Sequence, residues 1–187
     1  VRDELDKSPL RGKKDPLDGS HWYQRCSDLS LSCKGELAVS DLQTMYPGDF
    51  AKQLEVVKRI GWGIDNLDLN DELAVRILET AGQRKAPMPD AHWPYKTPVV
   101  TLGKDSIAQA FFPNEAERLG EYLQREGYKN CRFYLINSQL PSCLKGDKTG
   151  VVRPLGLGGN DYDGIYDVDA YVDYVGSGRA RAGSSVG

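Results

Sequence analysis

The fold class is decided by one stretch near the end of the chain, IYDVDAYVDYV at residues 165–175. From 166 to 174 its even positions are Tyr, Val, Ala, Val and Tyr, and its odd positions are Asp, Asp, Tyr and Asp. Alternation with a period of two is typical of a strand with one apolar face and one polar face. The stretch therefore predicts a β-strand whose acidic face meets solvent.

Three earlier stretches also predict strands, because β-branched and aromatic residues are concentrated in them. They lie at residues 98–102, 107–112 and 131–136. The residues between the first two, GKD at 103–105, are typical of a hairpin turn. The third stretch is almost continuously apolar, as expected of a central strand.

Three helices are expected over residues 49–60, 71–81 and 115–126, where apolar residues recur at helical spacing between a capping residue and a glycine. The expected caps are Asp49, Asn70 and an Asn114–Glu117 capping box. The expected buried stripe of the first helix is Phe50, Leu54, Val57 and Ile60. The order of these elements predicts a single α+β domain, with about three helices packed on one side of a mainly antiparallel sheet formed largely by the second half of the chain.

The length of 187 residues suits one domain, and 40% hydrophobic and 27% charged residues are ordinary globular usage. Residues 1–20 are polar and contain Pro and Gly, which predicts an extended N-terminal arm. The globular domain is expected at 21–175, followed by a Gly/Ser/Arg-rich tail at 176–187. Within the domain, the proline-rich residues 81–98 predict a long loop, a feature that is often functional.

The net charge of −3 gives no basic excess of the kind that nucleic-acid binders carry, so nucleic acid is an unlikely partner. No apolar run reaches the roughly 18 residues of a membrane-spanning helix. Protein partners or self-association are expected instead.

The four cysteines form two local pairs in the sequence, and we expect disulfide bonds Cys26–Cys33 and Cys131–Cys143 because short loops lose little entropy on closure. Disulfide bonds persist in oxidising compartments, so this pairing predicts a secreted, extracellular protein. The alternative is four reduced cysteines.

His21 and His92, the two histidines, each precede a tryptophan. Histidine titrates near neutral pH, so the pair could serve as acid and base in a metal-free cleavage of a phosphodiester. A zinc site made of His21, Cys26, Cys33 and His92 is a separate alternative.

An acidic turn precedes the last predicted strand. Asp161, Asp163 and Asp167, with Gly164 among them, resemble part of a calcium loop, in which oxygen ligands alternate around a glycine. These carboxylates are the candidate ligands for Ca²⁺ or Mg²⁺. An EF-hand is not implied, because its first and twelfth positions would hold Gly159 and Ala170. The alternative is a solvated polar turn.

Two functions follow from these features. The first is a secreted, non-catalytic binding or interaction protein, such as an effector, a toxin or an assembly component. The second is a small secreted hydrolase that acts on a phosphodiester or a glycan, using His21 and His92 or the acidic cluster at 161–169. The sequence contains no motif that fixes a reaction, so enzymatic activity stays open.

Overall fold

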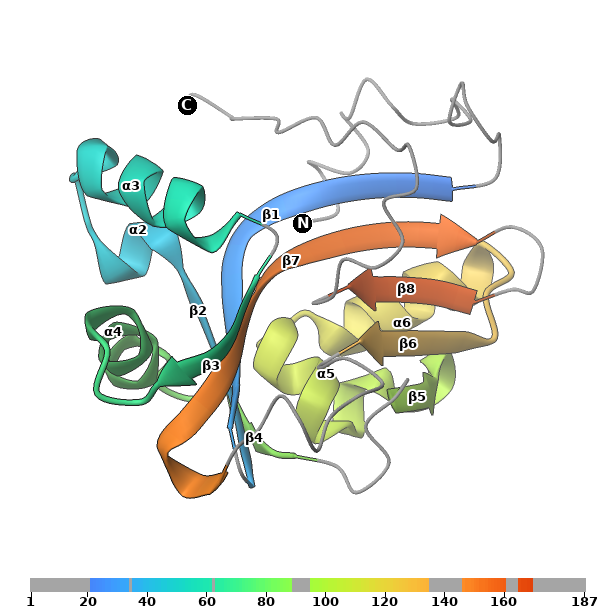
Figure 1. Ribbon diagram of the computed structural model, residues 1–187. Helices are drawn as coiled ribbons and strands as arrows, with labels where there is room; N and C mark the ends of the chain where they lie inside the picture. Colours follow the sequence, from blue (N-terminus) through green and yellow to red (C-terminus); the bar gives the residue numbers. More distant parts are fainter. Residues whose placement is uncertain are drawn as a thin grey trace.

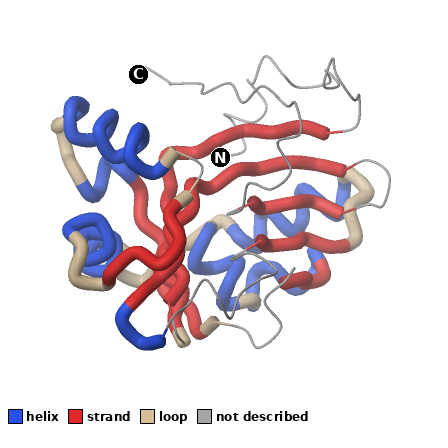
Figure 2. The backbone as a smooth tube through the Cα atoms, in the orientation of Figure 1, coloured by secondary structure: helices blue, strands red, loops and turns tan. Residues whose placement is uncertain are grey.

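The computed structural model describes residues 21–33, 35–61, 63–88, 95–134, 146–160 and 165–169. Within them, eight strands form one sheet in the order β4-β2-β1-β7-β8-β6-β5, and β3 pairs with β7 (Figures 1 and 2). The pairing of β6 with β8 is parallel, and the other described pairings are antiparallel. The predicted α+β fold with a mainly antiparallel sheet is therefore confirmed. The predicted arm, the predicted tail and residues 170–175 lie outside the described residues.

The sheet draws its strands from both halves of the chain, so the prediction of a sheet formed largely by the second half is wrong. The strands are β1 (His21–Cys33), β2 (Glu36–Asp41), β3 (Ile64–Asp68), β4 (Lys85–Pro87), β5 (Tyr95–Pro98), β6 (Asn130–Tyr134), β7 (Thr149–Asn160) and β8 (Ile165–Asp169). β1 has an LSLS alternation at residues 29–32, but its serines are buried along with its leucines. A strand buried on both faces with serine on one of them carries a weak sequence signal. β4 and β5 likewise lie within the predicted long loop.

The helices are α2 (Leu42–Met45), α3 (Phe50–Ile60), α4 (Glu72–Thr80), α5 (Ser106–Phe111) and α6 (Ala116–Arg125), with 3-10 helices η1 (Val99–Lys104) and η2 (Gly146–Lys148). α3, α4 and α6 confirm the three predicted helices. Asp49 caps α3 as predicted, and its carboxylate accepts a hydrogen bond from Lys52 N at 2.9 Å. Asp71, not Asn70, caps α4. The predicted capping box of α6 does not form, because Glu115 occupies the cap position and makes no side-chain cap bond.

The two strands predicted at 98–102 and 107–112 are wrong, because η1 and α5 occupy these positions. The predicted hairpin turn ends in Asp105, which is the cap of α5 and accepts a hydrogen bond from Ala108 N at 2.9 Å. A short apolar run has no periodicity that separates a strand from a buried helix. Here the Asp105 cap and the burial of Ile107, Ala110 and Phe111 stabilise a helix instead of a strand.

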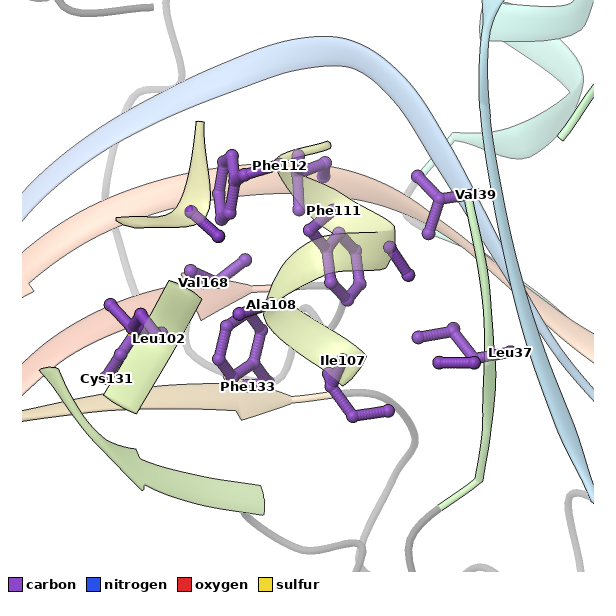
Figure 3. Packing of buried hydrophobic residues seen from close by; sticks show 14 of the residues in the cluster. Leu37, Val39, Leu102, Ile107, Ala108, Phe111, Phe112, Cys131, Phe133 and Val168 are labelled. Atoms are coloured by element: carbon purple, nitrogen blue, oxygen red, sulfur yellow. The ribbon is translucent and has the colours of Figure 1, made fainter. Parts of the chain in front are cut away.

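Helices cover both faces of the sheet, at opposite ends, so the predicted one-sided cover is also wrong (Figure 1). One core packs α5, α6 and η1 against the sheet, with the rings of Phe111 and Phe133 stacked 5.5 Å apart between centroids (Figure 3). The other core packs α2, α3 and α4 against the opposite face. Val151 and Val152 of β7 are neighbours in sequence, yet each contributes to a different core.

The predicted buried stripe of α3 is only partly buried. Ile60 is buried and Val57 is half-buried, but Phe50 is 74% exposed and Leu54 is 54% exposed. We call Phe50 and Leu54 the α3 shoulder, because they lie on the helix beside the buried face that Val56 and Ile60 form. The apolar stripe of this helix is therefore wider than the surface that its own domain covers.

The predicted disulfide bonds are not seen among the cysteines whose side chains the structure describes, Cys33 and Cys131. The Cys33 thiol donates a hydrogen bond to Glu36 O at 3.5 Å. Cys26 lies seven residues earlier in the same strand. Seven extended residues span roughly 20 Å, whereas a disulfide needs Cα atoms about 4.4–6.8 Å apart. A disulfide bond between Cys26 and Cys33 is therefore incompatible with β1. Cys143 lies outside the described residues.

Candidate functional site: an open face of the sheet

One face of the sheet formed by β7, β8, β6, β5 and the first part of β1 has no described helix over it. On the opposite side, Cys131, Phe133 and Val168 are completely buried in the core that α5 and α6 cover. Figure 1 shows α6 behind β6 and β8, and the described helices α2, α3 and α4 lie at the other end of the sheet. We call this side, over which no described helix lies, the open face.

The central row of the open face crosses five strands. Strand register pairs Tyr23 with Gly158, Gly158 with Asp167, Asp167 with Arg132, and Arg132 with Lys96. Residues that face each other across a sheet lie on the same side of it. The strand register therefore places Tyr23, Asp167, Arg132 and Lys96 at positions of one row. Lys96 is exposed and Arg132 is half-buried.

A second row of the same face lies two residues further along each strand, closer to the middle of β1. The register pairs Arg25 with Gly156 and Gly156 with Asp169, which in turn faces Tyr134 of β6. Thus β7 contributes glycine at both of these rows of the open face. A glycine within a strand is often a place where a ligand or another backbone comes close, because no side chain intervenes.

Two of the predicted site residues lie in strands of the open face. His21 begins β1 opposite Asn160, the last residue of β7, and Asn160 also faces Ile165, the first residue of β8. Asp167 lies in the adjacent row. The sheet therefore brings His21 and Asp167, from opposite ends of the chain, onto the same face with β7 between their strands. Sequence reasoning had assigned these two residues to separate hypotheses.

The other predicted site residues, His92, Asp161 and Asp163, lie outside the described residues. Convergence of His21 with His92, and an ion bound by the three aspartates, therefore stay predictions. Among the described side chains, no group of three His, Cys, Asp or Glu residues is arranged to hold a metal ion. The zinc alternative fails on geometry, because His21 and Cys33 are the two ends of the same thirteen-residue strand, whereas zinc ligands must all lie about 2 Å from one ion.

A charged cluster that sequence reasoning missed lies where β1 bulges. The register of β1 with β7 shifts between Arg25 and Leu29, and Asp28 lies in this bulge. Arg84 Nη1 lies 2.7 Å from Asp28 Oδ1 and 3.9 Å from Asp41 Oδ2. Burial is the main cause that raises the pKa of Asp28, and Arg84 partly offsets it.

The same guanidinium also binds the end of α5. Arg84 Nε donates to Ala110 O and Nη2 donates to Phe111 O, both at 3.1 Å. All of its described contacts thus hold β1, β2 and α5 together, which is a scaffold role. No sequence signal could have joined Asp28 to Arg84, because only the packing of α5 on the sheet brings them together.

No protein-family model, curated protein or solved structure matches this chain. Among the described residues, no helix has the length and apolar character required to cross a membrane. Any function must therefore be inferred from the surfaces themselves, and the open face is the best-defined of them.

Proposed function

We propose that this chain is a non-catalytic binding or interaction protein, of the effector, toxin or assembly-component kind, and that a protein partner lies across the open face. The observation that carries the proposal is the sheet itself, which has a helix layer on one side of β6 and β8 and none of the described helices on the other (Figure 1).

The charges of the open face favour a protein surface as the partner. Strand register assigns to the two glycine-bearing rows the basic residues Arg25, Arg132 and Lys96 and the acidic residues Asp167 and Asp169, so neither sign of charge is in large excess in their sequence. A polyanion such as a nucleic acid requires a much stronger basic excess. A protein surface carries both signs, and complementary pairs can fix its orientation.

Site-specific photo-crosslinking tests this proposal. A photoreactive amino acid placed at Lys96, on the open face, should crosslink to one identifiable protein. The same group placed at Glu121, an exposed residue of α6 on the helix-covered side, should not. The purified partner should then bind the wild-type chain and lose at least about tenfold in affinity for Gly158→Val, which adds a branched side chain to the central row. Equal crosslinking from both positions, or unchanged affinity of Gly158→Val, would contradict the proposal.

A hydrolase acting on a phosphodiester or a glycan is the second candidate, because His21 and Asp167 lie on the same face. An imidazole and a carboxylate are suitable groups for proton transfer, provided that each comes within hydrogen-bond reach of the substrate. The test is turnover of bis-p-nitrophenyl phosphate and of p-nitrophenyl glycosides by wild type, His21→Ala and Asp167→Asn. Turnover by wild type that falls at least about a hundredfold in both variants supports a hydrolase. No turnover, or equal turnover in all three chains, argues for binding without catalysis.

Secretion stays a prediction, and the described cysteines give it no support. Alkylation without reductant, followed by mass spectrometry of the intact chain, counts the thiols directly. Modification at all four cysteines would remove the cysteine argument for an extracellular location.

A further inference from the structure

The α3 shoulder is the second surface that the fold leaves without a described partner. Phe50 and Leu54 are 74% and 54% exposed, although both belong to the apolar stripe of the helix. Residues four apart are neighbours on a helix surface, so Phe50, Leu54 and Lys58 follow one another along it. The two apolar side chains of the α3 shoulder are therefore followed by a cation, Lys58, on the same row of the helix surface.

Among the cations of α3, Lys58 is exposed and is the one for which the described part of the chain shows no ion pair. The other two cations of α3 form ion pairs. Arg59 Nη2 lies 2.5 Å from Oδ2 of Asp71, the cap of α4, and Lys52 Nζ lies 3.2 Å from Glu55 Oε1. Within the described residues, Lys58 makes no ion pair. Its ammonium group is therefore available to a second molecule that docks on the shoulder.

We propose that the α3 shoulder docks on a second copy of this chain, with the two α3 helices antiparallel about a two-fold axis at Leu54. Phe50 and Lys58 lie at equal distances along the helix on either side of Leu54. In this arrangement Leu54 meets Leu54 of the second copy, and Phe50 meets its Lys58. The stripe is therefore complementary to itself, as a two-fold symmetric interface requires.

Three physical terms stabilise this pairing. The central leucines bury apolar area. Each lysine ammonium approaches the face of a phenylalanine ring, which is a cation–π contact repeated by symmetry. The antiparallel helices also place the positive end of one helix dipole beside the negative end of the other. Two apolar residues per copy cover much less than the roughly 800 Å² per partner of a standard stable interface, so the dimer is weak and depends on concentration.

Sedimentation velocity over about a hundredfold range of concentration tests this dimer. The wild-type chain should shift from monomer to dimer as the concentration rises. Leu54→Glu and Leu54→Lys should each remain monomeric, because like charges then meet on the axis. An equal mixture of these two variants should dimerise again, because opposite charges now meet. Phe50→Ser should also weaken the dimer, whereas Val100→Glu, which changes a 66% exposed valine outside α3, should not.

A wild-type chain that stays monomeric throughout this range overturns the proposal. Dimerisation of Leu54→Glu to the wild-type extent, or a mixture of the two Leu54 variants that remains monomeric, overturns it equally. Circular dichroism confirms that each variant is folded. This interface does not involve the open face, so its failure leaves the crosslinking result at Lys96 unaffected.

Discussion

Arg84 holds three elements in place with a single guanidinium. It contacts carboxylates of β1 and β2 and the last carbonyls of α5. Burial removes the Asp28 carboxylate from water and raises its pKa, although the neighbouring cation acts in the opposite direction. Groups whose pKa is shifted often mark functional sites, but buried ion pairs of a scaffold shift pKa values as well. The many structural contacts of Arg84 favour the scaffold explanation.

The raised pKa of Asp28 predicts how stability depends on pH. The folded chain binds a proton at Asp28 more tightly than the unfolded chain does, so the contribution of this group to stability is largest below the unfolded pKa of about 3.8 and falls as pH rises through the folded pKa. Asp28→Asn cannot titrate. The stability of the wild type relative to Asp28→Asn should therefore decrease between about pH 4 and neutral pH, by about 1.4 kcal/mol for each tenfold difference in proton affinity.

Urea denaturation of both chains at several pH values measures this trend. A stability difference between wild type and Asp28→Asn that rises with pH would mean that the Arg84 ion pair outweighs burial.

Two buried serines give a matched pair for testing hydrogen bonds. Ser30 Oγ has no hydrogen-bond partner in the described part of the chain, whereas Ser40 Oγ lies 2.7 Å from Thr80 Oγ1. A buried hydroxyl without a partner costs free energy, and a satisfied one contributes about 1 kcal/mol. Ser30→Ala should therefore leave the free energy of unfolding unchanged or raise it, and Ser40→Ala should lower it by about 1 kcal/mol. Equal losses in the two variants would show that Ser30 is also hydrogen-bonded.

At the scale of elements, the predictions succeeded where periodicity was long and failed where it was short. α3, α4 and α6 span enough turns for apolar spacing to show, and glycines end or follow them. α5 has six residues, and its sequence SIAQAF is as compatible with a strand as with a helix. Its helical state is set by the Asp105 cap and by burial in the core.

Asp105 is therefore predicted to stabilise α5 by its side chain. Its carboxylate accepts from Ala108 N at 2.9 Å and from Tyr95 Oη at 2.6 Å. Burial and this carboxylate raise the pKa of Tyr95 to about 12. Asp105→Ala should lower the free energy of unfolding by about 1–2 kcal/mol, and Asp105→Asn, which keeps the cap, should lower it by less. Urea denaturation compares the variants, and equal losses would show that the charge rather than the cap is important.

At the scale of the whole molecule, the two cores are connected by shared strands. On β2, Leu37 and Val39 pack in the core of α5 and α6, and Ala38 packs in the core of α2, α3 and α4. β7 divides its side chains in the same way. If either helix layer separated from the sheet, it would expose apolar residues of strands on which the other helix layer also packs.

This connection predicts that the described domain unfolds in one step. Near-UV and far-UV circular dichroism should give coincident thermal transitions. Leu37→Ala, in one core, and Ile77→Ala, in the other, should each lower that single transition, with a cost of about 2–5 kcal/mol. Two separated transitions in either variant would show that the cores are independent units.

The sequence by itself determined the fold class, the three longer helices and the start of the last strand, because these depend on local periodicity and caps. It could not determine the sheet order, the helical state of α5, the exposure of the α3 shoulder or the Arg84 cluster. Each of these depends on which surfaces meet after the chain folds. The open face is the clearest case, since His21 and Asp167 are far apart in sequence and only the register of β1, β7 and β8 places them on one side of the sheet.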